Sequence, residues 1–115
     1  TLTIGEVDEV ELSHGFFDYT EKYSLRTSAI HVPARITKEQ AAMVKAAATT
    51  VYRALGCRGF ARVDFFLTPS GKLVFNEVNT IPGLTAHSRF PKMLEVAGIP
   101  LEDAVTQAIE EALEP

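Results

Sequence analysis

Four polar side chains in two neighbouring stretches of the sequence have the types and spacing for phosphate chemistry. Arg62 and Asp64 lie two positions apart, and Glu77 and Asn79 repeat that spacing in the second stretch. Carboxylate and amide oxygens are ligands that Mg²⁺ prefers, and a guanidinium group suits a phosphate. A solvated sheet face with an Arg–carboxylate pair is the competing interpretation, and the spacing alone supports both equally.

The stretch from Arg62 to Ser88 is predicted to form a hairpin followed by a loop. Aromatic and β-branched residues at 63–66 and 74–78 favour strands, and the sequence TPSG at 68–71 between them favours a tight turn. A four-residue connection makes the sum of paired positions odd, so even positions of the first strand share a face with odd positions of the second. We therefore expect the four polar side chains on one face. The following loop, NTIPG at 79–83, offers backbone N–H groups and hydroxyls to a phosphate.

The N-terminal third of the chain is predicted to form a strand and an ordered loop. Residues 2–12 have the pattern of a strand, interrupted at Gly5 by a bulge or twist. Residues 13–27 carry four aromatic rings, which indicates a loop that folds over a functional site, with a loop packed on its own domain as the alternative. The acidic residues of the first strand are either metal ligands or its solvated edge, and we favour the edge because no His or Cys accompanies them: Glu6, Asp8, Glu9 and Glu11.

Three helices are predicted around the hairpin. The first covers residues 37–56, with a capping box of Thr37 and Gln40 and with Gly56 just after its end. The second covers about residues 89–97, and Ser88 is expected to cap it. The third begins at Pro100. Its predicted buried stripe consists of Leu101, Val105, Ala108, Ile109 and Ala112.

Composition and charge bound the class of protein. A chain of 115 residues forms one domain or a large part of one, and the net charge of −4 with scattered basic residues argues against a nucleic-acid partner. No apolar run approaches the ~18 residues of a membrane span and no export signal is present, so we expect a cytoplasmic protein. Cys57 is the single cysteine, which excludes an internal disulfide, and we expect it to be buried. Because the chain starts at Thr1, we expect a piece of a longer protein.

Three stretches resemble the C-terminal part of the D-alanine–D-alanine ligase family, which has the ATP-grasp fold. They are FFDYTEKY at 16–23, GCRGFARVDFF at 56–66, and NEVNTIPGLTAHS at 76–88 followed by RFP. Within the family, the text looks most like the vancomycin-resistance ligases of the VanG type, which join D-alanine to D-serine. The resemblance implies an α+β fold, a mainly antiparallel β-sheet with helices packed on one face. It also implies that residues 1–115 are part of a catalytic domain whose partner domains, the N-terminal and central ones, are absent.

The resemblance assigns roles to the polar face of the hairpin. Asp64, Glu77 and Asn79 match the ligands of two Mg²⁺ ions, with Mn²⁺ as an alternative metal. Arg62 matches a catalytic arginine that steadies the transferring phosphoryl group.

Residues of the two loops also match functional positions of the family. The backbone N–H of Gly83 is expected to face the tetrahedral intermediate, and Ser88 to hold the carboxylate of the second amino acid. Lys22 and Asn76, together with the bridging glutamate of the hairpin, match residues that bind ATP. Tyr23 matches a catalytic residue of the mobile loop that closes over the site.

The implied reaction uses ATP to phosphorylate the carboxylate of D-alanine, after which the amino group of D-serine attacks the acyl phosphate. The product is a dipeptide precursor of peptidoglycan, and we expect the parent enzyme to be a homodimer and the isolated chain to be inactive. An ordinary D-alanine–D-alanine ligase is the nearest alternative, because Leu84 and Ala86 depart from the family pattern near the second-substrate pocket. A non-catalytic module of the same fold, binding metal, nucleotide or a protein, is the alternative of another class.

Overall fold

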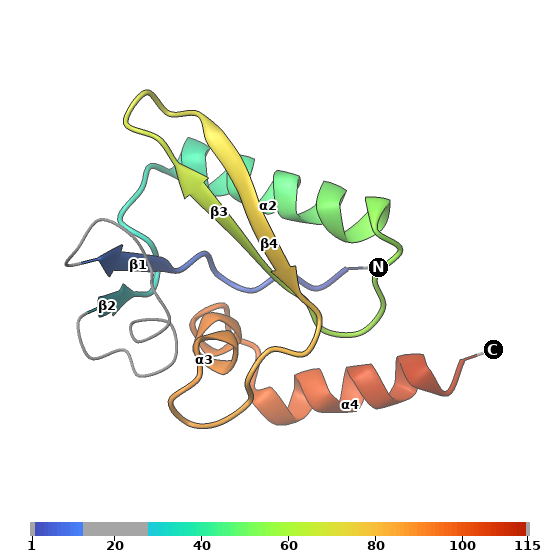
Figure 1. Cartoon of the computed structure of the whole chain (residues 1–115). Coiled ribbons are helices and arrows are strands. Elements are labelled where there is room, and N and C mark those ends of the chain that lie inside the picture. The colour runs from blue at the N-terminus through green and yellow to red at the C-terminus, as the bar shows by residue number, and fades with distance from the viewer. Residues whose placement is uncertain (1, 13–27, 115) are drawn as a thin grey trace.

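The computed structural model describes residues 2–12 and 28–114, which contain four strands and three helices (Figure 1). None of the described helices has the length and apolar character needed to cross a membrane. In chain order the elements are β1 (Glu9–Leu12), β2 (Ser28–His31), α2 (Lys38–Ala54), β3 (Arg62–Leu67), β4 (Leu73–Asn79), α3 (Arg89–Val96) and α4 (Leu101–Ala112).

The described strands pair as two separate antiparallel ladders. Strand β1 pairs with β2, placing Glu9 opposite His31, and β3 pairs with β4, placing Arg62 opposite Asn79. Both ladders are antiparallel and helices lie beside them, so the α+β composition expected from the sequence is confirmed.

The connection between β3 and β4 is longer than predicted, and a bulge compensates for it. Leu67 pairs with Leu73, so residues 68–72 make a five-residue connection in place of the predicted four. A regular ladder would then place Asp64 opposite Asn76. The register shifts by one residue, and Asp64 lies opposite Glu77 instead. The extra residue in β4 therefore restores the odd sum of paired positions on which the shared polar face depends.

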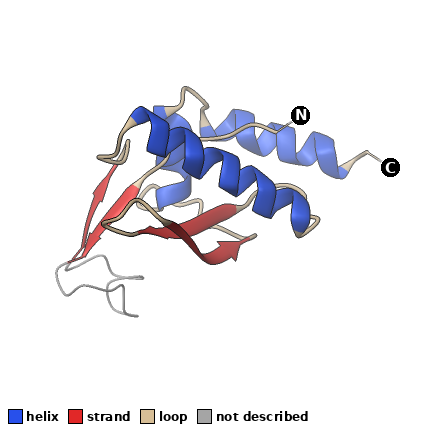
Figure 2. Ribbon diagram, turned by 90° about the horizontal axis from the view of Figure 1, so that it is seen from above, coloured by secondary structure: helices blue, strands red, loops and turns tan. Residues whose placement is uncertain are grey.

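Helix α2 lies within the predicted range of residues 37–56 but ends at Ala54, and its predicted capping box is confirmed. The side chain of Thr37 accepts a hydrogen bond from the Gln40 backbone N–H at 3.0 Å, and the Gln40 side chain accepts one from the Thr37 N–H at 3.1 Å. Gly56 follows the helix with a φ of 65°, a conformation that glycine adopts without steric cost. The helix runs along one face of the β3–β4 hairpin, behind it in Figure 1, and Figure 2 shows the same layering from above.

Helices α3 and α4 enclose the most buried apolar residues of the described chain. Phe90, Leu94 and Ala104 form this cluster, with Phe60 and Ile99 packed against it. The predicted stripe of α4 is partly wrong, because Ile109 is 56% exposed and Ala104, which lies outside that stripe, is buried. Ala104 belongs to the buried cluster with Phe90 and Leu94 of α3, so the buried part of α4 lies near its start.

Residues 2–8 form no strand, so the predicted strand is confirmed only for Glu9–Leu12. The segment is held by backbone hydrogen bonds from the Glu6 N–H to the Met93 carbonyl at 2.9 Å and from the Ala34 N–H to the Val7 carbonyl at 2.8 Å. A Cβ at Gly5 would lie 3.2 Å from the Met93 oxygen. Close packing against α3, and not the expected bulge, therefore explains this glycine.

Candidate active site

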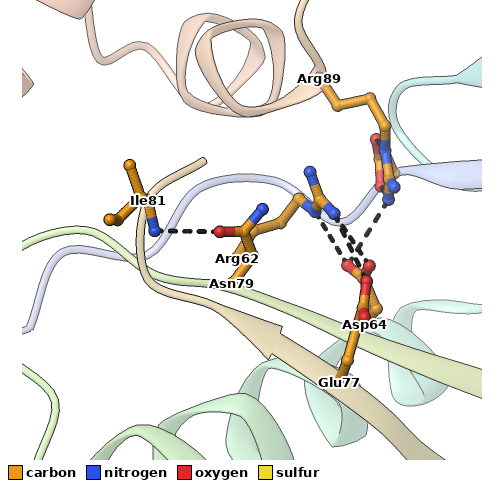
Figure 3. A network of polar contacts seen from close by, with 7 residues as sticks. Arg62, Asp64, Glu77, Asn79, Ile81 and Arg89 are labelled. Atoms are coloured by element: carbon orange, nitrogen blue, oxygen red, sulfur yellow. Dashed lines mark hydrogen bonds and ion pairs between the residues drawn. The ribbon is translucent and has the colours of Figure 1, made fainter. Parts of the chain in front are cut away.

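The four predicted polar residues lie on one face of the β3–β4 hairpin (Figure 3). Arg62 donates hydrogen bonds to both carboxylate oxygens of Asp64, at 3.0 and 3.1 Å. Glu77 is opposite Asp64 in the register, and its carboxylate lies 4.0 Å from the Arg62 guanidinium. Asn79 is opposite Arg62. The predicted convergence of these side chains is confirmed, whereas their roles remain predictions.

The charges of this face are shielded from solvent to different degrees. The side chains of Arg62 and Asp64 are 12% and 15% exposed, and that of Glu77 is 38% exposed. A solvated sheet face, the competing interpretation, would leave the Arg62–Asp64 pair exposed. Because a half-buried ion pair interacts through a lower effective dielectric, its charges act more strongly on one another and on a bound ion than surface charges do.

A second arginine, which the sequence interpretation gave no role, reaches the same face from α3. The guanidinium of Arg89 donates to the two carboxylate oxygens of Asp8 at 2.7 and 2.8 Å. It also lies 3.9 Å from Asp64. Burial of the guanidinium lowers the pKa of Arg89, but the hydrogen bond and charge of Asp8 and the nearby charges of Asp64 and Glu77 outweigh it, so the pKa is raised. Arg89 is therefore a permanent cation at the edge of the site.

The interpretation of Asp8 as part of a solvated edge is wrong, because its side chain is only 2% exposed. The sequence contained a signal: Asp8 occupies the same alternation as the apolar residues Leu2, Ile4 and Val10. A charged residue at an apolar position of a predicted strand indicates a buried partner. The identity of that partner, 81 positions away, could not be read from the pattern.

The loop between β4 and α3 brings Gly83 and Ser88 together. A Cβ at Gly83 would lie 2.6 Å from the Ser88 Oγ, so only glycine fits beside this hydroxyl. The Ser88 Oγ accepts a hydrogen bond from the Thr85 N–H at 3.1 Å and lies 2.7 Å from the Thr85 Oγ1. Ser88 occupies the N-cap position of α3, but its side chain makes no capping hydrogen bond, which corrects the predicted role. Thr85, which the sequence interpretation missed, orients the Ser88 hydroxyl instead.

The donor set of the hairpin face fits a hard divalent cation. Asp64, Glu77 and Asn79 offer oxygen donors only. No group of three or more His, Cys, Asp or Glu side chains suited to a metal occurs within residues 2–12 and 28–114. A metal here would thus use two carboxylates, an amide oxygen and further oxygens from phosphate or water, which is the pattern of Mg²⁺ sites. The Asn79 Oδ1 accepts a hydrogen bond from the Ile81 N–H at 3.0 Å, which fixes the orientation of that amide.

The remaining residues singled out in the sequence are not among the four polar residues of the hairpin face, and two of them lie outside the described residues. Asn76 is the extra, exposed residue of β4, and with Glu77 it lines a cavity of about 820 Å³ that extends under the hairpin. Lys22 and Tyr23 lie outside the described residues. Cys57 is half-buried, less buried than expected.

Comparison with known proteins identifies the family. Residues 1–110 match the family described as D-ala D-ala ligase C-terminus. The chain belongs to this family. The match covers the hairpin, the loop from Gly83 to Ser88, α3 and α4 as far as residue 110, so the resemblance seen in the sequence is confirmed.

Individual ligases of the family are similar over nearly the whole chain. The crystal structure of VanG D-Ala:D-Ser ligase from Enterococcus faecalis is 57% identical, with a TM-score of 0.79, over 92% of this chain and 31% of that one. A D-alanine–D-alanine ligase from Chlorobium phaeovibrioides is 48% identical over 93% of this chain and 30% of its own length. The structure of D-alanine–D-alanine ligase from Bacillus anthracis complexed with ATP is 31% identical, with a TM-score of 0.74, over 95% of this chain and 35% of that one.

These similarities establish the ATP-grasp α+β fold that the sequence indicated. The chain spans about a third of the length of the relatives that it matches.

Proposed function

We propose that the chain is the C-terminal catalytic part of an ATP-dependent ligase that joins D-alanine to D-serine for peptidoglycan synthesis. The observation that carries the proposal is the hairpin face, on which an arginine and three oxygen-donor side chains converge beside the Gly83–Ser88 loop. In this proposal the remaining two thirds of the ligase supply the first-substrate pocket and most of the nucleotide site, and residues 1–115 alone are inactive.

The first proposed step is transfer of a phosphoryl group from ATP to the carboxylate of D-alanine. A related ligase has been crystallised with ATP, which supports the choice of nucleotide. Asp64, Glu77 and Asn79 would hold Mg²⁺, which neutralises negative charge on the phosphates. Arg62 would then turn its guanidinium from Asp64 towards the transferring group, since the same planar fork matches a carboxylate or a phosphate.

The second proposed step is attack of the amino group of D-serine on the acyl phosphate. The backbone N–H of Gly83 would stabilise the oxyanion, and one such donor contributes about 10²- to 10³-fold to the rate. The Ser88 hydroxyl would bind the carboxylate of the incoming amino acid. Close contact between Gly83 and the Ser88 Oγ supports this division, because it places the two donors side by side.

The identity of the second substrate is the finer part of the proposal. Identity of 57% to a D-Ala:D-Ser ligase supports D-serine, and identity of 48% to a D-alanine–D-alanine ligase supports the alternative. The test is kcat/KM of the full-length protein for D-serine and for D-alanine as second substrate at neutral pH. We expect a preference for D-serine. A preference for D-alanine would overturn this choice, and absence of any dipeptide would overturn the ligase itself.

A non-catalytic module of the same fold is the alternative from another class, and it predicts no dipeptide from the wild-type full-length protein. Glu77→Gln tests the metal role on which the ligase proposal depends. This substitution keeps the size of the side chain but removes a charge from the proposed metal site. We expect ATP-dependent dipeptide formation by the full-length protein to fall to background. Unchanged dipeptide formation would show that Glu77 has no metal role.

A further inference from the structure

One guanidinium nitrogen faces two carboxylates that belong to different parts of the chain. The Arg89 Nη2 lies 2.7 Å from the Asp8 Oδ1 and 3.9 Å from the Asp64 Oδ1. Figure 3 shows Arg89 directed towards Asp64 from the side of α3. Asp8 therefore competes with Asp64 for this nitrogen and holds it at hydrogen-bonding distance.

Asp64 is already paired with another arginine. Arg62 binds both of its carboxylate oxygens, and the carboxylate of Glu77 lies near the same guanidinium. Among residues 2–12 and 28–114, these two guanidinium groups and three carboxylates thus carry a formal excess of one negative charge. Without the charge of Asp8 this excess disappears. Asp64 then lies 3.0 Å from Arg62 and 3.9 Å from Arg89, and Arg89 has lost the carboxylate that binds it at 2.7 Å. A divalent cation would then have to displace both.

We propose that Asp8 is a positioning residue that holds Arg89 away from Asp64 and so keeps the Asp64 carboxylate available to the metal. The inference rests on the metal role of Asp64 in the proposed function. It adds a residue from the N-terminal segment, far from the hairpin in sequence, that acts only through Arg89. A side chain that is 2% exposed and binds a guanidinium through both oxygens is held rigidly enough for this role.

The test is the affinity of the full-length protein for Mn²⁺ alone, measured by the EPR signal of the free ion. In Asp8→Asn the amide cannot neutralise Arg89, so the guanidinium turns to Asp64. We expect the Kd for Mn²⁺ to rise about tenfold or more, the usual effect of losing a group that orients a metal ligand. In the double variant Asp8→Asn/Arg89→Met the competing cation is gone, and we expect the Kd to return to within about threefold of wild type.

A purely structural role predicts the opposite order. If the ion pair only joined the N-terminal segment to α3, the double variant would bind Mn²⁺ no better than Asp8→Asn, and that result would overturn the inference. An unchanged Kd in Asp8→Asn would overturn it as well. If the double variant does not fold, Asp8→Asn/Arg89→Lys replaces it. Lysine is shorter and cannot make paired hydrogen bonds to Asp64, so it should restore part of the Mn²⁺ affinity. No recovery of that affinity would count against the inference.

The matched control is Glu9→Gln. Glu9 also binds an arginine through both carboxylate oxygens, but its partner Arg35 is 54% exposed and neither residue contacts Asp64 in the described contacts. We expect its Kd for Mn²⁺ to equal that of wild type. Dipeptide formation, measured on the same proteins, separates the two proposals. Loss and rescue of Mn²⁺ affinity without ligase activity would refute the proposed function alone, and an active ligase with unchanged affinity in Asp8→Asn would refute the inference alone.

Discussion

Arg62 and Asp64, two positions apart on β3, form an ion pair through both carboxylate oxygens, with N–O distances of 3.0 and 3.1 Å. A charge-assisted pair of this geometry is stronger than a neutral hydrogen bond. In the proposed reaction both partners have other tasks, since Asp64 binds metal and Arg62 faces the phosphoryl group. The pair is therefore a resting arrangement that the nucleotide and its metal would exchange for their own contacts.

Arg62→Lys tests the need for the planar guanidinium. Lysine keeps the charge but cannot make paired hydrogen bonds, so we expect kcat of dipeptide formation in the full-length protein to fall about 10²-fold. The control is Arg53→Lys, an exposed residue near the end of α2, which should leave kcat unchanged. A full kcat in Arg62→Lys would show that charge alone suffices.

Gly83→Ala tests the contact with Ser88. The added methyl group would lie 2.6 Å from the Ser88 Oγ, so the hydroxyl must move and lose its hydrogen bonds to Thr85. Loss of a hydrogen bond to a charged group costs about 1.5–3 kcal/mol, so we expect KM for the second amino acid to rise about tenfold or more. Ser88→Ala should have a similar effect on KM. Adding Gly83→Ala to it should then cost little, and fully additive effects would contradict the proposed contact.

Thr37→Ala tests the capping box of α2. The substitution removes the side-chain acceptor of the Gln40 N–H, and loss of such a cap costs about 1 kcal/mol in the free energy of unfolding. Urea denaturation followed by circular dichroism measures the change. Thr50→Ala on the same helix is the control, because the Thr50 hydroxyl only donates to the Ala46 carbonyl within the helix. Equal effects of the two substitutions would refute a special role for the cap.

The Glu9–Arg35 pair gives a pH dependence of stability. The hydrogen bond from Arg35 lowers the pKa of Glu9 below its ordinary value of 4.5. A carboxylate with a lowered pKa stabilises the fold above the unfolded value, and this contribution is lost as the pH falls through the folded value. We expect Glu9→Gln to lower Tm slightly at about pH 7, because the pair is partly exposed and its charges are screened by solvent. The effect on Tm should be smaller at about pH 3, where protonation of Glu9 is favoured. A difference in Tm that is the same at both pH values would contradict this assignment.

Several features of the fold and of the candidate site depend only on residues that are close in sequence, and the sequence alone predicts them. The capping box of Thr37 and Gln40 lies within one helical turn. Alternation along each strand places Arg62 with Asp64, and Glu77 with Asn79, on one face of their own strand. The loop from Gly83 to Ser88 resembled the ligase family in sequence, because its residues form one contiguous motif. Such features depend on neighbours a few positions apart, so pattern and spacing are enough to predict them.

Tertiary structure alone decided which polar residues of the site lie opposite one another and which charges are paired. The bulge at Asn76, which places Asp64 opposite Glu77, reflects a five-residue connection whose length the turn signal did not reveal. The burial of Asp8 and its pairing with Arg89 depend on packing residues 2–8 against α3, across 81 positions of sequence. No local pattern reports such a contact, because the two charges meet only when distant segments pack together, and only there does their attraction offset the cost of desolvating both. The sequence determined which groups could do phosphate chemistry, and the fold decided which carboxylate each arginine neutralises.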